Sequence, residues 1–398
     1  MKIKKSSTLM FLYAITARLH IDFIGRLMAS EILAIIQLSF VNISSVFKKN
    51  KALRIITYWV LVLLIAQVVS DIYNNSSVTT SLKGVSVLVF MMVSVVFFIA
   101  QLTKNKKSIF FYFFGMSVIA LFLPDYPYKS ISHPQFFKVS IFPIIIPLVL
   151  TASYFSYKKY HLTAYLFILI TFIAFMFDSR SYGLIFLISA VILYLYEIDF
   201  RPNPKKTLLS FFILTSIFYS MYALYVHNVI SGNISGPSTQ QILKLDNPFN
   251  PIELLQYGRV DTFVGIKAAM DKPMMGHGYM PIDHNRHYIE IKEEMLRKSI
   301  NQQSALIPVH SVIIGAWVYA GIIGLVAIIS IYSYLIILFY QIYLSRSFDR
   351  YMPILIFSVV MMTWNMLFSP YGHLRTTIPI IIALLLALSQ QKENSNFS

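Results

Sequence analysis

The sequence contains no cysteine and has few charged residues. Without cysteine, disulfides, thiolate nucleophiles, iron–sulfur clusters and cysteine-based zinc sites are excluded. Charged residues make up only 13% of the 398 positions, about half the share that a soluble globular domain carries. Hydrophobic residues make up 57%, and the mean hydropathy is +0.66. A soluble chain of two or three domains is therefore excluded, and we expect an all-α polytopic membrane protein.

Long apolar runs recur along the whole chain. A membrane-spanning helix takes about 20 residues. Hydropathy and loop charge together predict about twelve spans, near residues 8–24, 27–47, 54–72, 82–102, 108–124, 134–152, 160–178, 182–198, 207–230, 309–343, 352–369 and 374–389. The run at 309–343 would be about 52 Å long as one helix, against a hydrocarbon core of about 30 Å. We therefore expect it to project past the membrane, to tilt, or to break near Gly321 and Gly324.

The net charge of +16 is concentrated in short loops between the spans. This pattern is typical of cytoplasmic loops, so it predicts an orientation with both termini inside and does not indicate a nucleic-acid partner. The basic runs are Lys48, Lys49, Lys51 and Arg54; Lys104, Lys106 and Lys107; Lys158 and Lys159; Arg201, Lys205 and Lys206; and Arg346 and Arg350.

One long hydrophilic segment, 231–309, lies on the opposite side and is net neutral. It divides the chain into an N-terminal bundle of about nine spans (1–230), this large periplasmic loop (231–309), and about three C-terminal spans (310–398). The loop predicts two amphipathic helices on the outer membrane face, near 250–271 and 284–303. In the first, Asn250 caps the helix, Pro251 follows, and Glu253 reaches back to the cap.

Four side chains oppose the charge bias because they lie on the non-cytoplasmic side: Arg180, Arg259, His310 and Arg375. Arginine presents a planar donor fork that matches phosphate oxygens. Histidine accepts a proton near neutral pH. Together they are what a transfer reaction with a phosphate leaving group needs, with the arginines binding a diphosphate and the histidine activating a hydroxyl.

Each of these side chains also has a structural interpretation. Arg180 could snorkel to the lipid headgroups, and Arg259 could pair with a nearby carboxylate such as Asp261. His310 could be an interfacial residue at a helix start, and Arg375 could contact lipid phosphate. Only the combination on one membrane face favours a functional site.

We expect no metal and no cofactor. The loop contains no Asp-x-Asp pair that would hold a metal beside a diphosphate. Three loop histidines do not have a helical zinc-site spacing, namely His277, His284 and His287.

Three elements in order resemble the superfamily of O-antigen polymerases and ligases. The loop reads GRVDTF at 258–263 and AAMDKPMMGHG at 268–278, which is similar to the family's loop signature of an Arg that opens a helix ending in a Pro-apolar-apolar-Gly-x-Gly turn. His310 and the Gly-x-x-Gly at 321–324 resemble its next span, and Ser179-Arg180-Ser181 resembles its upstream Ser-Arg turn. The resemblance covers roughly 175–330. Two positions depart from it, since the family often has Asn at 311 and Trp at 263.

The resemblance implies a GT-C-like glycosyltransferase of the bacterial inner membrane with a periplasmic active site. Its substrate would be an oligosaccharide on undecaprenyl diphosphate, held by Arg180 and Arg259, with Arg375 as a further binding residue and His310 assisting the acceptor hydroxyl. A separate chain-length regulator is a possible partner. We favour the polymerase over the ligase, because polymerases tolerate more sequence variation. A lipid-linked oligosaccharide flippase is a further alternative, but its charges should line a cavity through the midplane.

Overall fold

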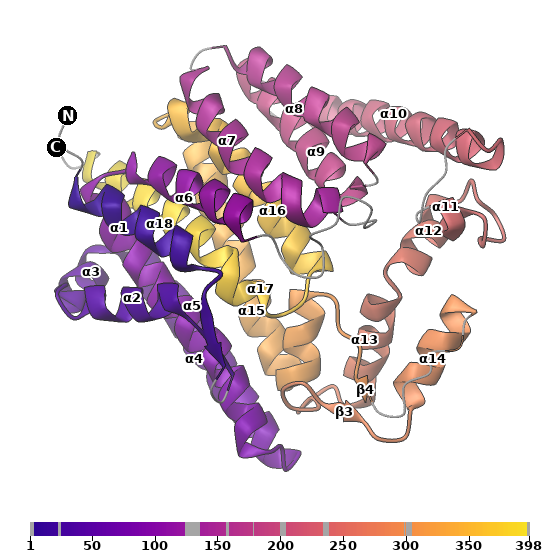
Figure 1. The fold of residues 1–398 in the computed structure, drawn as a ribbon, viewed down its shortest axis with the longest axis horizontal. Helices are drawn as coiled ribbons and strands as arrows, with labels where there is room; N and C mark the ends of the chain where they lie inside the picture. Colours follow the sequence, from indigo (N-terminus) through magenta and orange to yellow (C-terminus); the bar gives the residue numbers. More distant parts are fainter. Residues whose placement is uncertain are drawn as a thin grey trace.

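The computed structural model describes residues 4–22, 25–123, 136–156, 159–177, 179–199, 204–233, 239–297, 299 and 305–395. These residues are mostly helical, which confirms the predicted all-α class, and Figure 1 shows the arrangement. The N-terminal part contains α1 (Lys5–Thr16), β1 (His20–Asp22), β2 (Arg26–Met28), α2 (Ala29–Leu38), α3 (Ile43–Lys49), α4 (Lys51–Tyr73), α5 (Val78–Lys104), α6 (Ser108–Phe122), the π-helix η1 (Phe137–Ile141), α7 (Phe142–Phe155), α8 (Tyr160–Met176), α9 (Arg180–Glu197) and α10 (Pro204–Ile230).

The loop elements and the C-terminal helices complete the fold. The loop contains α11 (Thr239–Ile242), α12 (Pro251–Gly258), α13 (Val260–Asp271), β3 (Ile282–Asp283), α14 (His287–Leu296) and β4 (Ala305–Leu306). After it come α15 (Val312–Ser345), the 3-10 helix η2 (Asp349–Tyr351), α16 (Met352–Phe368), α17 (His373–Thr376) and α18 (Ile378–Ser395). β1 pairs with β2 and β3 with β4, both antiparallel. In Figure 1 the elements α11 to α14 gather on one side of the molecule, away from α1 to α3.

Six helical segments in the described residues are long and apolar enough to cross a membrane: α4, α5, η1 with α7, α9, α15, and η2 with α16. Shorter apolar helices are α6, α8 and the first part of α18. This architecture is consistent with a multi-pass membrane protein, while the count of twelve spans stays a prediction. The helices pack α8 against α9, α1 against α6, α15 against α4 and α18 against α5.

The predicted span 27–47 is not one straight helix. It forms α2 and α3, which meet at a bend of 88°. The cause is local, because the side chain of Asn42 accepts a hydrogen bond from the backbone N–H of Ser45 and thereby starts a new helix. The ends of several other predicted spans, such as residues 124, 134–135 and 178, lie outside the described residues.

The long helix α15 breaks at Gly321. Of the three possibilities for this run, the structure shows the break near Gly321 and Gly324. Gly321 has φ 64° and ψ −163°, a conformation open to glycine. The turn 273–278 occupies the break: the N–H of Ile322 donates to the carbonyl of Pro273 (2.9 Å), and the N–H of His277 donates to the carbonyl of Val318 (2.6 Å). A Cβ at Gly321 would overlap the carbonyl oxygen of Met274. The broken helix and the loop turn are therefore one structural unit.

Helix α4 holds the same turn from the other side. The backbone N–H of Tyr279 donates to Oδ1 of buried Asp71 (2.6 Å), and the N–H of Gly278 donates to Oγ of Ser70 (3.0 Å). Nδ2 of Asn74 donates to the carbonyl of Gly276 (3.1 Å). These contacts fix the loop to the membrane helices and so position everything that the loop carries.

The first predicted loop helix is two helices. Asn250 caps α12 as expected, since its side chain accepts from the N–H of Ile252 (3.0 Å). Glu253 does not reach back to the cap; its carboxylate accepts the N–H groups that precede α12, at 246 and 247. The helix then ends at Arg259, whose φ of −130° is not helical, and α13 begins at the next residue.

The second predicted loop helix, 284–303, begins later and is shorter. Asp283 accepts the N–H groups of Tyr288 and Ile289 through Oδ2 (2.8 and 2.9 Å), which sets the start of α14 at His287. The helix ends at Leu296, where Arg297 turns to a left-handed conformation. The rest of the predicted helix falls largely outside the described residues.

Candidate functional site

Arg259 lies at the junction of α12 and α13. Its Nη1 donates to the carbonyl of Phe368 (3.3 Å), and its guanidinium lies over the rings of Trp364 and Phe368, 5.2 and 4.9 Å from the centroids. Among the described residues it forms no ion pair with Asp261 or Glu253, so the surface-pair interpretation does not describe this site. Burial, and then the charge of Arg180, lowers the pKa of Arg259.

His310 immediately precedes the cap of α15. The neighbouring Ser311 starts that helix, because its Oγ accepts from the N–H of Ile314 (3.2 Å) and donates to the carbonyl of Met366 (3.0 Å). Ser311, and not His310, therefore caps the helix, and the side chain of His310 is half exposed. Nδ1 of His310 lies 3.8 Å from Oδ2 of Asp261.

The surroundings of His310 favour the neutral ring. Burial lowers the pKa of His310 most, and the charges of Arg259, Lys138 and Lys292 lower it further, against an opposing effect of Asp261. Asp261 is itself paired with Lys292, with Nζ and Oδ1 2.8 Å apart. A neutral imidazole can accept a proton, which is the role that the sequence predicts for this residue.

Arg180 is the first residue of α9. Its Nη2 donates to Oε1 of Gln241 in α11 (2.8 Å), which connects the end of a membrane helix to the loop. Arg180 also lies close enough to Arg259 for its charge to lower the pKa of that residue. The structure thus places Arg259 near both Arg180 and His310, which come from distant parts of the chain.

Two further basic residues join this cluster, neither of which is among the site residues predicted from the sequence. The charge of Lys138, in η1, lowers the pKa of both His310 and His373. Burial is the largest cause of the lowered pKa of His373, and the charge of His310 follows. Lys138 lies at the outer end of the predicted span 134–152. A basic residue on the non-cytoplasmic side is the same signal that marks Arg180 and Arg375, so Lys138 was predictable from the sequence.

Arg375 has a different environment. Its Nε and Nη2 donate to the two carboxylate oxygens of Glu31, a residue only 1% exposed, and Nη2 also donates to the carbonyl of Arg26 (2.7 Å). The guanidinium lies over the ring of Phe90, 4.7 Å from its centroid. These contacts connect α17 to α2 and favour a structural role, while substrate binding by Arg375 stays a prediction.

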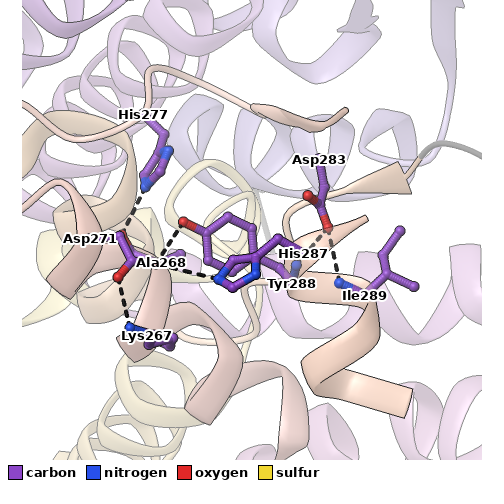
Figure 2. A network of polar contacts seen from close by, with 8 residues as sticks. All are labelled: Lys267, Ala268, Asp271, His277, Asp283, His287, Tyr288 and Ile289. Atoms are coloured by element: carbon purple, nitrogen blue, oxygen red, sulfur yellow. Dashed lines mark hydrogen bonds and ion pairs between the residues drawn. The ribbon is translucent and has the colours of Figure 1, made fainter. Parts of the chain in front are cut away.

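A network of polar contacts holds α13 against α14, and Figure 2 shows its members. Asp271 accepts from Nζ of Lys267 (2.9 Å) and from Oη of Tyr288 (3.0 Å), and it lies 4.0 Å from Nε2 of His287. Nε2 of His277 donates to the carbonyl of Ala268 (2.8 Å). In the part of the chain that the structure describes, no group of three or more acidic or histidine side chains could hold a metal ion.

The structure is an all-α chain, consistent with a multi-pass membrane protein, in which two arginines and a histidine of lowered pKa lie at helix ends beside a helical loop. No model of a known protein family matches the chain, and no curated protein sequence matches it.

Proposed function

We propose that this protein is a GT-C-like membrane glycosyltransferase that polymerises oligosaccharide repeat units carried on undecaprenyl diphosphate. In this proposal it spans the bacterial inner membrane about twelve times, and the site faces the periplasm. The observation that carries the proposal is the position of Arg259, whose surroundings include Arg180 on one hand and His310 on the other, so that two donors suited to a diphosphate accompany a proton acceptor.

The chemistry is a single displacement at the anomeric carbon of the donor. The acceptor hydroxyl attacks this carbon and forms the new glycosidic C–O bond. The bond from the anomeric carbon to the diphosphate oxygen breaks, and the diphosphate leaves with the electron pair. Nδ1 of His310 faces Asp261, so Nε2 takes the hydroxyl proton. Arg180 and Arg259 stabilise the charge that develops on the leaving group, where fixed cations contribute most.

The same cluster would serve an O-antigen ligase, which transfers the finished polymer to lipid A-core. It is less suited to a lipid-linked oligosaccharide flippase. A flippase should distribute its charges along a cavity through the membrane midplane, whereas these side chains sit at helix ends beside one loop.

The test uses a strain that lacks the gene, complemented with plasmid-borne variants, and compares surface polysaccharide on gels. Deletion should leave a core that carries one repeat unit and no ladder. Bare core with accumulated lipid-linked polymer would instead identify a ligase.

His310→Ala should fail to restore the ladder at normal protein level in the membrane. His284→Ala is the matched control, since this exposed loop histidine has no described polar contact, and it should restore the ladder. A normal ladder from His310→Ala would refute the assigned role.

A further inference from the structure

An open cavity of about 270 Å³ lies in the loop, and its lining includes Val260, the neighbour of Arg259 in the chain. It is lined by the segment after α11, by α12, by the start of α13 and by the C-terminal end of α14. Its polar lining consists of Lys244, Asp246, Glu253, Gln256, Tyr257 and Arg297. The proposed reaction does not use any of these side chains.

Several of the lining side chains form hydrogen bonds within the loop. Asp246 pairs with Arg297 through two hydrogen bonds, with Nη1 2.8 Å from Oδ1. The carboxylate of Glu253 accepts two backbone N–H groups, and Oη of Tyr257 donates to the carbonyl of Leu296 (3.2 Å). These contacts join α12 to the end of α14 and keep the cavity open between them.

Two lining side chains are left for a ligand. Among the described residues, the side chains of Lys244 and Gln256 form no hydrogen bond, and both residues are exposed. Lys244 offers donors only, while the amide of Gln256 offers both donors and an acceptor.

The chemistry of the lining selects a neutral polyhydroxyl ligand. The two carboxylates, Asp246 and Glu253, balance two cations, so the lining is net neutral and does not concentrate positive charge for a phosphate. Polar side chains stand beside apolar ones such as Leu245 and Met295, so a fully apolar chain would leave polar groups without partners. A sugar hydroxyl is both a hydrogen-bond donor and an acceptor, so it matches a lining that contains both donor and acceptor groups. The ring of Tyr257 adds an apolar surface, and the volume lies just below the range of about 300–1,000 Å³ for whole small-molecule sites, which suits a ligand as small as one sugar ring.

We infer that this cavity binds one sugar residue of the repeat unit; the inference rests on the proposed function and names a binding site for its substrate. Gln256 lies in the last turn of α12 and precedes Arg259 by three residues. Val260, which follows Arg259, also lines the cavity. The cavity and the arginine that would hold the diphosphate therefore belong to the same short segment of the loop.

The experiment measures direct binding by calorimetry to the full-length protein in lipid nanodiscs. The probe is the free oligosaccharide repeat unit, released from the lipid of the host strain by mild acid. Wild-type protein should bind it, and Gln256→Leu and Lys244→Leu should each weaken binding about tenfold or more, because each loses hydrogen bonds to the sugar. Glu290→Leu is the control, since this exposed residue of α14 lies outside the cavity and has no described side-chain hydrogen bond. Its affinity should equal that of the wild type.

Two results would overturn the inference. They are absence of binding to the wild type, and cavity variants that bind the oligosaccharide as tightly as the wild type does. Competition by inorganic diphosphate at this site would identify an anion site instead. The same preparations separate this inference from the proposed function: His310→Ala should bind the oligosaccharide normally while it makes no polymer. Cavity-dependent binding together with a normal ladder from His310→Ala would sustain the sugar site and refute the catalytic proposal.

Discussion

At the scale of single residues, the central feature is the approach of two guanidinium groups, Arg180 and Arg259. Burial lowers the pKa of Arg259 most, and the like charge of Arg180 lowers it further. The ring faces of Trp364 and Phe368 offset part of the cost, because a ring attracts a cation to its face. An anion placed between the arginines would offset the remaining repulsion, so this arrangement favours the binding of a diphosphate.

The pH dependence of activity follows from the surroundings of His310. Because its pKa lies below the usual 6.5, the neutral ring persists to lower pH, and activity should fall only on the acid side of that value. The carboxylate of Asp261 raises this pKa, so Asp261→Asn should move the acid limb to still lower pH. Lys292 lowers it, so Lys292→Gln should move the limb to higher pH. Polymerisation rates measured against pH in proteoliposomes test both shifts, and a limb that moves in the same direction for both variants would contradict this account.

At the scale of elements, the contact between the broken helix α15 and the turn 273–278 organises the loop. The break frees backbone groups around Gly321, and the turn supplies partners for them. Such groups need partners wherever water is excluded, which explains why a glycine-rich turn and an interrupted helix occur together in one chain. The local pattern predicts each piece, but their mutual contact depends on residues more than 40 positions apart.

The variant Gly321→Ala tests this contact. A Cβ would strain the positive φ and overlap the carbonyl of Met274, so the substitution should cost at least about 1 kcal/mol and loosen the loop. We expect a lower Tm in detergent and faster proteolysis within the loop. Gly258→Ala is the control, because a Cβ there meets no atom within 4 Å. Equal stability of the two variants would show that the turn is not held by the break.

The pair of Arg375 and Glu31 links two other elements, α17 and α2. Removal of one partner from a buried ion pair leaves an uncompensated charge, so Arg375→Met alone should lower the free energy of unfolding by about 3–5 kcal/mol. The double variant Arg375→Met with Glu31→Leu should recover most of this loss. Denaturation measures the stability, and the polysaccharide ladder measures activity. A normal ladder from the stable double variant would show that Arg375 does not bind substrate, and loss of the ladder from that variant would show that it does.

At the scale of the whole molecule, the sequence predicts the helices far better than their interruptions and partners. Hydropathy places apolar helices because membrane burial depends on composition, which is local. It does not predict the 88° bend between α2 and α3, since that bend depends on the cap that Asn42 provides, which an apolar average hides. It does not predict the break at Arg259 either, where the backbone leaves the helical conformation without a side-chain cap. The partner of Arg375 lies 344 positions away, so no local pattern identifies it. Arg180, Arg259 and His310 were predictable together because they share one side of the predicted topology.

That topology gives the final prediction, and the absence of cysteine makes its test free of background. Single cysteines are introduced at three exposed positions and labelled with a membrane-impermeant maleimide in whole spheroplasts. Asn247→Cys, in the loop, should react at once, because the proposal places this loop outside the cytoplasm. Ser347→Cys and Lys49→Cys should react only after permeabilisation, because they lie in the basic loops predicted to face the cytoplasm. Labelling of Lys49→Cys from outside would mean that the bent pair α2 and α3 enters the membrane and returns to the same side without crossing it. The number of spans before α4 would then be odd. Labelling of Asn247→Cys only after permeabilisation would place Arg259 and His310 on the cytoplasmic side and remove the periplasmic site from the proposal.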